Sequence, residues 1–192
     1  MMLRDGTLLY HGSYTAVERI DLSCCMVGKD FGRGFYLTDD YAQAERFVRA
    51  SMRKAAKNGI ALPSAGTGFV SVFRYEQRNG IALFEFGTAD RDWLHCVAAH
   101  RRESGALRNE LTKWQRYDIL AGKIANDTTN QVLTAYINGL YGMPGSERAD
   151  EIAISLLLPN RLSGQVCFKT ETSLACLSFR EARLTNRQGA AR

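Results

Sequence analysis

Three short segments, far apart along the chain, carry residue types that can do chemistry. The first is Tyr10-His11-Gly12-Ser13, which follows a short apolar run. A histidine there can offer a ring nitrogen to a hydroxyl group, and the glycine after it lets backbone amide and carbonyl groups approach a flat ligand closely. Taken alone, this segment is better explained by a histidine whose ring nitrogens are hydrogen-bonded within a turn.

The second segment runs from Lys29 to Thr38 and contains Gly32, Gly34 and Tyr36. Its two glycines permit a sharp loop whose successive amides can bind an anion, and Tyr36 can offer its ring face to an aromatic ligand. It is not a dinucleotide-binding G-x-G-x-x-G motif, because the third glycine is missing and a strand follows. A tight hairpin loop with a core tyrosine would explain the same residues.

The third segment spans residues 163–170, where Gln165 opens a strand rich in apolar residues. A polar residue in that position can point its amide into a cleft. An edge position at the start of a strand would equally accommodate it. Each of the three segments alone is therefore weak evidence for a ligand site, and their order along the chain is the more informative feature.

That order resembles the diphtheria-toxin-like and PARP-like ADP-ribosyltransferase superfamily, which is marked by a His-Tyr-Glu triad. Over about residues 8–180, the sequence more closely resembles a bacterial branch of small domains of unknown function within that fold. The segments that carry this closer resemblance are Leu9–Ser13, Asp30–Thr38, Tyr117–Ile119 with Ala125–Asp127, and Gln165–Thr170 with Glu171.

The resemblance implies an α+β, ADP-ribosyltransferase-like fold with split, antiparallel-rich sheets around an NAD cleft and flanking helices. His11 would bind the adenosine-side ribose of NAD, Gly12 backbone groups would hold the nicotinamide carboxamide, and Tyr36 would stack on the nicotinamide ring. Phe47 or Tyr41 would supply a second aromatic. The full set of implied NAD contacts is Tyr10, His11, Gly12, Ser13, Asp30, Phe31, Gly32, Arg33, Gly34, Tyr36, Thr38 and Phe47.

The chain departs from the triad at Gln165, where the superfamily has glutamate. A carboxylate there stabilises the positive charge that develops on the ribose as nicotinamide leaves. Glutamine can bond the same hydroxyl but brings no charge, and a loss of roughly 2–4 kcal/mol slows the reaction about 30- to 1,000-fold. The implied catalytic residues are His11, Tyr36 and Gln165, and slow or target-restricted transfer is expected.

A further polar group consists of Asp118, Asn126 and Asp127, on either side of Gly122. These residues are candidates for contacts with the acceptor or with ribose. Turn formation and helix capping would explain Asn126 and Asp127 just as well.

The elements that must hold these residues alternate irregularly along the chain. The patterns predict a strand over 7–10 that leads into a turn at 11–13, a strand over 35–38, and a helix from about 41 to 57 capped by Thr38-Asp39-Asp40. Further predicted strands span 69–75, 81–86, 117–122 (followed by a turn), 165–168 and 177–182, and further helices span 90–102, 127–140 and 149–158. Because βαβ alternation is absent, an α+β domain is favoured over a doubly wound sheet.

The composition limits the function classes. The 192 residues suit one domain, predicted over 1–184 with a disordered tail at 185–192. The sequence has no signal-peptide run and no membrane span, which predicts a cytoplasmic protein without a membrane partner. Five cysteines without metal-type spacing argue against a metal site, and a net charge of +5 permits anionic partners without requiring them.

The leading hypothesis is therefore an NAD-dependent mono-ADP-ribosyltransferase acting on a protein or nucleic-acid acceptor. The resemblance extends this to a bacterial toxin-like role, with a small neutralising partner protein and possible delivery to another cell. One alternative is a weak or inactive NAD- or nucleotide-binding module of the same fold. A purely structural or protein-interaction domain is another.

Overall fold

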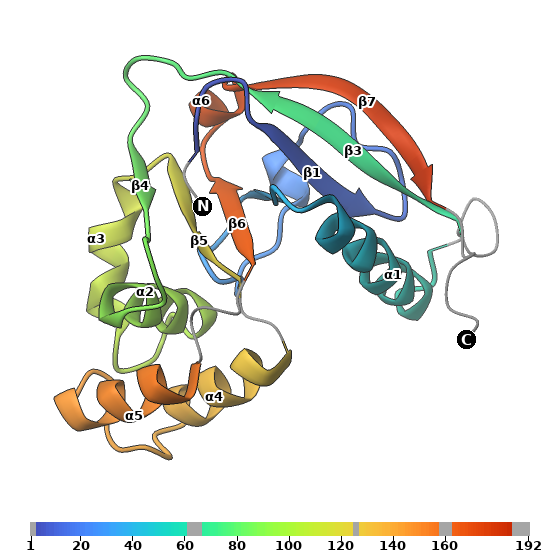
Figure 1. Ribbon diagram of the computed structural model, residues 1–192. Coiled ribbons are helices and arrows are strands. Elements are labelled where there is room, and N and C mark those ends of the chain that lie inside the picture. Colours follow the sequence, from blue (N-terminus) through green and yellow to red (C-terminus); the bar gives the residue numbers. More distant parts are fainter. Residues whose placement is uncertain (1–2, 61–66, 125–126, 158–162, 186–192) are drawn as a thin grey trace. The chain divides into compact units, whose positions relative to one another are not determined.

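The computed structural model describes residues 3–60, 67–124, 127–157 and 163–185, without the side chains of residues 127 and 128 (Figure 1). The described chain has a mixed α+β architecture that divides into two compact units, each discontinuous in sequence. The first unit holds residues 21–36 and 79–174, and the second holds residues 3–20, 37–78 and 175 onward.

The second unit is built on a three-stranded antiparallel sheet in the order β1-β3-β7, formed by Leu8–Ser13, Gly68–Tyr75 and Leu177–Thr185. Six of the eight residues of the central strand β3 are buried, and the strand is paired with β1 on one edge and with β7 on the other. Helix α1 (Tyr41–Lys57) packs on this sheet through Ala44 and Val48. It begins where Asp40 Oδ1 accepts a hydrogen bond from the Gln43 amide, an N-cap that satisfies one of the free donors of the first turn.

The first unit is built on a four-stranded sheet in the order β2-β6-β5-β4, formed by Phe35–Leu37, Gly164–Phe168, Ile119–Lys123 and Leu83–Glu85. Strands β5 and β6 are antiparallel, whereas β4 and β5 are parallel. The helices of this unit are α2 (Arg91–Arg101), α3 (Leu111–Gln115), α4 (Asp127–Ile137), α5 (Glu147–Leu157) and α6 (Glu171–Leu174), with 3₁₀ turns at Leu22–Cys24 and Arg108–Glu110.

A core of large side chains lies between these helices and the sheet. Its largest fully buried members are Trp93, Trp114, Tyr136, Phe31, Leu94, Leu120 and Leu133. Complete burial of each large apolar side chain stabilises the fold by about 1.5–3 kcal/mol, so this core holds the loop of Phe31 firmly against α2. None of the helices in the described ranges is long and apolar enough to cross a lipid bilayer.

Two local predictions from the sequence are wrong. Residues 11–13 do not turn, because β1 keeps its pairing with β3 up to the partners Ser13 and Phe69. Gly122 lies inside β5 rather than in a turn after it. A Cβ atom at Gly122 would lie 3.1 Å from Phe31 and from Phe86, so the glycine makes room for two core rings.

Several predicted elements match the structure within a few residues. They are the strands over 35–38, 69–75, 165–168 and 177–182 and the helices at 41–57, 90–102 and 149–158, the last of which is described up to residue 157. Thr185, predicted as the start of a tail, is the last residue of β7. Residues 186–192 lie outside the described residues.

Candidate functional site

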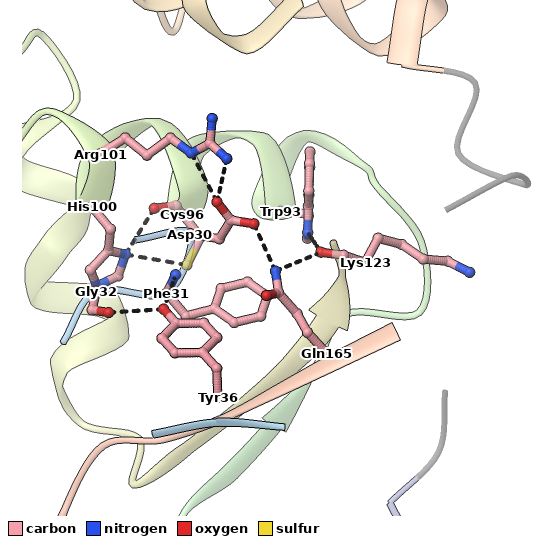
Figure 2. Close-up of polar contacts among 10 residues, drawn as sticks. All are labelled: Asp30, Phe31, Gly32, Tyr36, Trp93, Cys96, His100, Arg101, Lys123 and Gln165. Carbon is pink, nitrogen blue, oxygen red and sulfur yellow. Dashed lines mark hydrogen bonds and ion pairs between the residues drawn. The ribbon is translucent and has the colours of Figure 1, made fainter. Parts of the chain in front are cut away.

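Gln165 belongs to a buried polar cluster in the first unit (Figure 2). Its amide nitrogen Nε2 donates to Asp30 Oδ2 at 2.7 Å and to the backbone carbonyl of Lys123 at 3.1 Å. The other oxygen of Asp30 accepts from Nε of Arg101 at 2.8 Å and also from its Nη2. Four elements therefore meet here: strands β5 and β6, helix α2, and the loop that precedes β2.

Tyr36 is joined to the same loop through its hydroxyl group. The hydroxyl donates to the carbonyl of Gly32 at 2.8 Å and accepts from the amide of Phe31 at 2.9 Å. Both partners are backbone groups, so the ring of Tyr36 is fixed relative to the loop at residues 31–32. Burial raises the pKa of the Tyr36 hydroxyl well above its ordinary value, which keeps it a proton donor throughout the physiological range.

The two glycines of this loop have packing roles in the structure. Gly32 has a φ angle of +81°, and a Cβ atom on it would lie 2.6 Å from the ring of His100. A Cβ atom on Gly34 would lie 2.5 Å from the sulfur of Cys167. The loop therefore packs closely against helix α2 and strand β6, which explains both glycines without a ligand.

The remaining residues of the loop contact protein. The side chain of Phe31 is completely buried and stacks on Phe86, with ring centroids 5.6 Å apart. Arg33 donates to the carbonyls of Leu22 and Ser23, at 3.1 and 2.7 Å, so its guanidinium holds the preceding 3₁₀ turn.

Burial also sets the titration of two groups around the cluster. The thiol of Cys167 is fully buried, and burial raises its pKa to about 12, so it is not a thiolate nucleophile at neutral pH. His100 shares a 2.8 Å hydrogen bond between its Nδ1 and the carbonyl of Cys96, and burial lowers the pKa of its imidazole. Its ring is therefore neutral near pH 7.

The segment Tyr10–Ser13 lies in the second unit, on β1. Tyr10 exchanges two backbone hydrogen bonds with Thr38, of 2.8 and 3.0 Å. Since backbone groups alternate in direction along a strand, the amide and carbonyl of Gly12 point the same way as those of Tyr10, away from β3. Within the described residues, no protein group pairs with the amide and carbonyl of Gly12.

Gly12 also lies close to helix α1. A Cβ atom on it would lie 1.9 Å from the carbonyl oxygen of Ala44. On the same helix, the ring of Tyr41 meets that of Tyr10 edge-on at 5.3 Å, and Phe47 is 42% exposed. His11, half-buried on β1, faces the strand partner Ser71.

A model of a protein family described as "Protein of unknown function (DUF3990)" matches residues 7–179. The chain belongs to the DUF3990 family. The matched range includes His11, Tyr36 and Gln165. No curated protein and no solved structure matches the chain.

The predicted site residues of this DUF3990 protein thus fall into two groups. The structure brings Asp30, Phe31, Gly32, Tyr36 and Gln165 together in the first unit. The second group lies in the second unit, on β1, on α1 or directly after β2. Its members are Tyr10, His11, Gly12, Ser13, Thr38 and Phe47.

Of the candidate acceptor contacts, only Asp118 is described with its side chain. Its carboxylate accepts from the Ala82 amide at 2.9 Å and from the Thr170 hydroxyl at 2.8 Å, so it joins the start of β4 to the start of α6. Asn126 lies outside the described residues. Asp127 is the first residue of α4, with no side chain described.

Two features were not predicted from the sequence. Gln43 on α1 is only 5% exposed, and neither its amide nitrogen nor its oxygen has a hydrogen-bond partner in the described structure. A glutamine in an amphipathic helix gives no sequence signal for this. In the first unit, the fully buried Asp150 accepts a hydrogen bond from Tyr136, shares a hydrogen bond of 2.8 Å with His95 Nε2 and forms an ion pair with Arg91 Nε at 3.0 Å, which ties α2, α4 and α5 together.

Proposed function

We propose that this DUF3990 protein is a slow NAD-dependent mono-ADP-ribosyltransferase with an ADP-ribosyltransferase-like fold. It transfers ADP-ribose to a protein or nucleic-acid acceptor and releases nicotinamide. The proposal keeps the residue roles that the resemblance implies: His11 for the adenosine-side ribose, Gly12 for the carboxamide, Tyr36 for the nicotinamide ring and Gln165 for the nicotinamide ribose.

The observation that carries the proposal is the outward-facing backbone of Gly12. Its amide and carbonyl lie side by side on the edge of β1, as a donor and an acceptor. A primary carboxamide such as that of nicotinamide presents the complementary acceptor and donor, so the two can form a pair of hydrogen bonds. The buried, unpartnered amide of Gln43 in the same unit adds support, because an unsatisfied polar group costs about 1–3 kcal/mol that a polar ligand would remove.

The first unit supports the chemical step. The C–N glycosidic bond of NAD breaks with its electron pair passing to nicotinamide, and the ribose carbon then bonds to a nucleophilic oxygen or nitrogen of the acceptor, which loses a proton to solvent. Tyr36, whose ring is fixed by its hydroxyl, would hold the leaving group. Gln165 would accept a hydrogen bond from a ribose hydroxyl without adding the negative charge that speeds bond cleavage.

The same neutrality of Gln165 favours one other function, an NAD-binding module that does not turn its ligand over. Calorimetric titration with NAD, run beside an assay for released nicotinamide, separates the two. Binding together with release supports the transferase, whereas binding without release supports the module. A protein that does not bind NAD at millimolar concentration has neither function.

The role of Gly12 is best tested from the ligand, because Gly12→Ala would press a methyl group into helix α1. Nicotinamide should inhibit the release reaction at least tenfold more strongly than nicotinic acid. The carboxylate of the acid cannot donate to the Gly12 carbonyl and is repelled by it. Equal inhibition by the two compounds would contradict the assigned carboxamide contact.

The role of Tyr36 is tested by replacing it with alanine. Tyr36→Ala should abolish nicotinamide release and the labelling of a cell extract with labelled NAD. Met143→Ala removes a 73% exposed apolar side chain from the same unit and should leave both unchanged. Nuclease treatment of the extract then distinguishes a nucleic-acid acceptor from a protein acceptor.

A further inference from the structure

The surroundings of Gln165 decide which way its carboxamide faces. Its nitrogen lies 2.7 Å from Asp30 Oδ2 and 3.1 Å from the Lys123 carbonyl oxygen. A carboxylate and a backbone carbonyl are both pure acceptors, so only the NH₂ group can face them. The two protons of that group are then both used.

Asp30 is in turn held in place by Arg101. The guanidinium of Arg101 donates to Oδ1 of Asp30 through two nitrogens, which leaves Oδ2 directed at Gln165 (Figure 2). Arginine carries its charge at all relevant pH values, so the carboxylate stays paired. The ammonium group of Lys123 points away from Gln165, and it is the backbone carbonyl of Lys123 that accepts from the Gln165 amide (Figure 2).

What the cluster leaves available is the oxygen of Gln165. Within the described residues, no protein group donates to Oε1, and Oε1 is not among the buried polar atoms that lack partners. Oε1 therefore stays open to solvent or ligand while the rest of the side chain is buried.

We propose that the Asp30–Arg101 ion pair is a positioning device, which orients Gln165 so that the site offers Oε1 as a neutral acceptor to a ligand hydroxyl group. The identity of that hydroxyl, on the ribose of NAD, rests on the proposed function. The orientation of the carboxamide does not. Asp30 and Arg101 are thus positioning residues that act through Gln165.

The proposal has a consequence opposite to the one that the triad suggests. A glutamate at position 165 would set a carboxylate oxygen against Oδ2 of Asp30 and against the Lys123 carbonyl. The two carboxyl groups would then share a proton, which raises the pKa of the pair. Glutamate should therefore impair this site, although it is the residue that the superfamily triad contains.

The experiment compares Gln165→Glu with Gln165→Leu, which removes the amide without adding charge. Thermal unfolding of the intact chain is measured between pH 5 and pH 8. The introduced carboxyl group has a raised pKa in the folded state, so its stabilising proton is held at low pH and is lost as the pH rises. The melting temperature of Gln165→Glu should accordingly fall with pH relative to that of Gln165→Leu.

The double variant Asp30→Asn/Gln165→Glu supplies the rescue. Asparagine at position 30 can donate to the introduced carboxylate, which also gives Arg101 a nearby negative charge, so the extra pH dependence should disappear. Nicotinamide release should fall at least tenfold in Gln165→Glu at pH 8 and recover at least partly in the double variant. A simple structural defect at position 165 would not be repaired by a change at position 30.

Two results would overturn the proposal: Gln165→Glu and Gln165→Leu unfolding with the same pH dependence, or a folded double variant that keeps the pH dependence of Gln165→Glu. If the double variant does not fold, the comparison of the two single variants still tests the orientation of Gln165. If the wild-type protein releases no nicotinamide, the proposed function fails, while the unfolding curves still decide the orientation of Gln165.

Discussion

Removing only the hydroxyl group of Tyr36 separates its structural role from its proposed role with NAD. Tyr36→Phe deletes one bond to the carbonyl of Gly32 and one from the amide of Phe31, and leaves both backbone groups without that partner. Each buried bond lost in this way costs about 1–1.5 kcal/mol, so the free energy of unfolding should fall by about 2–3 kcal/mol. The aromatic ring, which is the part proposed to stack on nicotinamide, is kept.

Urea unfolding followed by tryptophan fluorescence measures this loss. Trp93 and Trp114 are completely buried and will shift their emission when the core opens. With a denaturant slope of about 2 kcal/mol per molar urea, the midpoint should fall by about 1 M. Tyr14→Phe is the matched control, because the Tyr14 hydroxyl has no hydrogen bond within the described residues, and its change should stay within about 0.5 kcal/mol.

Measuring the rate of nicotinamide release then tests the proposed role of the Tyr36 ring. At a temperature where the variant is folded, Tyr36→Phe should release nicotinamide within a few fold of the wild-type rate, whereas Tyr36→Ala should not. A Tyr36→Phe protein as stable as the wild type would refute the reasoning about the loop. A stable, folded Tyr36→Phe protein that had lost all release would show that the hydroxyl, and not the ring, does the work.

Two further predictions concern other buried groups of the first unit. Asp150→Asn should lower the free energy of unfolding by about 1.5–3 kcal/mol, because it replaces the buried carboxylate that accepts from Tyr136 and pairs with Arg91. The exposed Asp39→Asn is the control, and a loss below about 1 kcal/mol for Asp150→Asn in urea unfolding would contradict the prediction. Burial lowers the pKa of the His100 imidazole in the folded state. As the pH drops below about 6.5, the unfolded chain therefore takes up the proton before the folded chain does, and the free energy of unfolding falls by at most about 1.4 kcal/mol per pH unit. His100→Asn should flatten that acidic limb in urea unfolding between pH 5 and 7, and an unchanged slope would show that His100 is not its source.

The sequence predicted the elements whose signals are local. Asp40 begins a helix in the structure because it stands before an amphipathic run and caps the Gln43 amide, and both facts are visible in consecutive residues. The predicted turn at 11–13 was wrong because the end of β1 is decided by its pairing with β3, some sixty residues away. Gly122 looked like a turn residue, but it is required by two phenylalanine rings from other parts of the chain.

The same distinction applies to the candidate site. Tyr36 and Gln165 stand out in their own segments, and in the structure both bond to the loop at residues 30–32. The contact between Asp30 and Gln165 spans 135 positions, and the one between Asp30 and Arg101 spans 71. Nothing in the spacing of one sequence encodes such contacts, and the same holds for the pair of His95 and Asp150.

The fit of Gly12 against the carbonyl of Ala44 affects how related chains should be compared. A side chain at position 12 is excluded by the helix itself, so descendants that no longer bind any ligand would still be under selection to keep glycine there. Its retention in an alignment therefore records the packing of β1 on α1 and carries no information about activity. Comparisons that aim to separate active from inactive relatives should weigh the outward-facing neighbours of Gly12, which are free to drift once a ligand is lost.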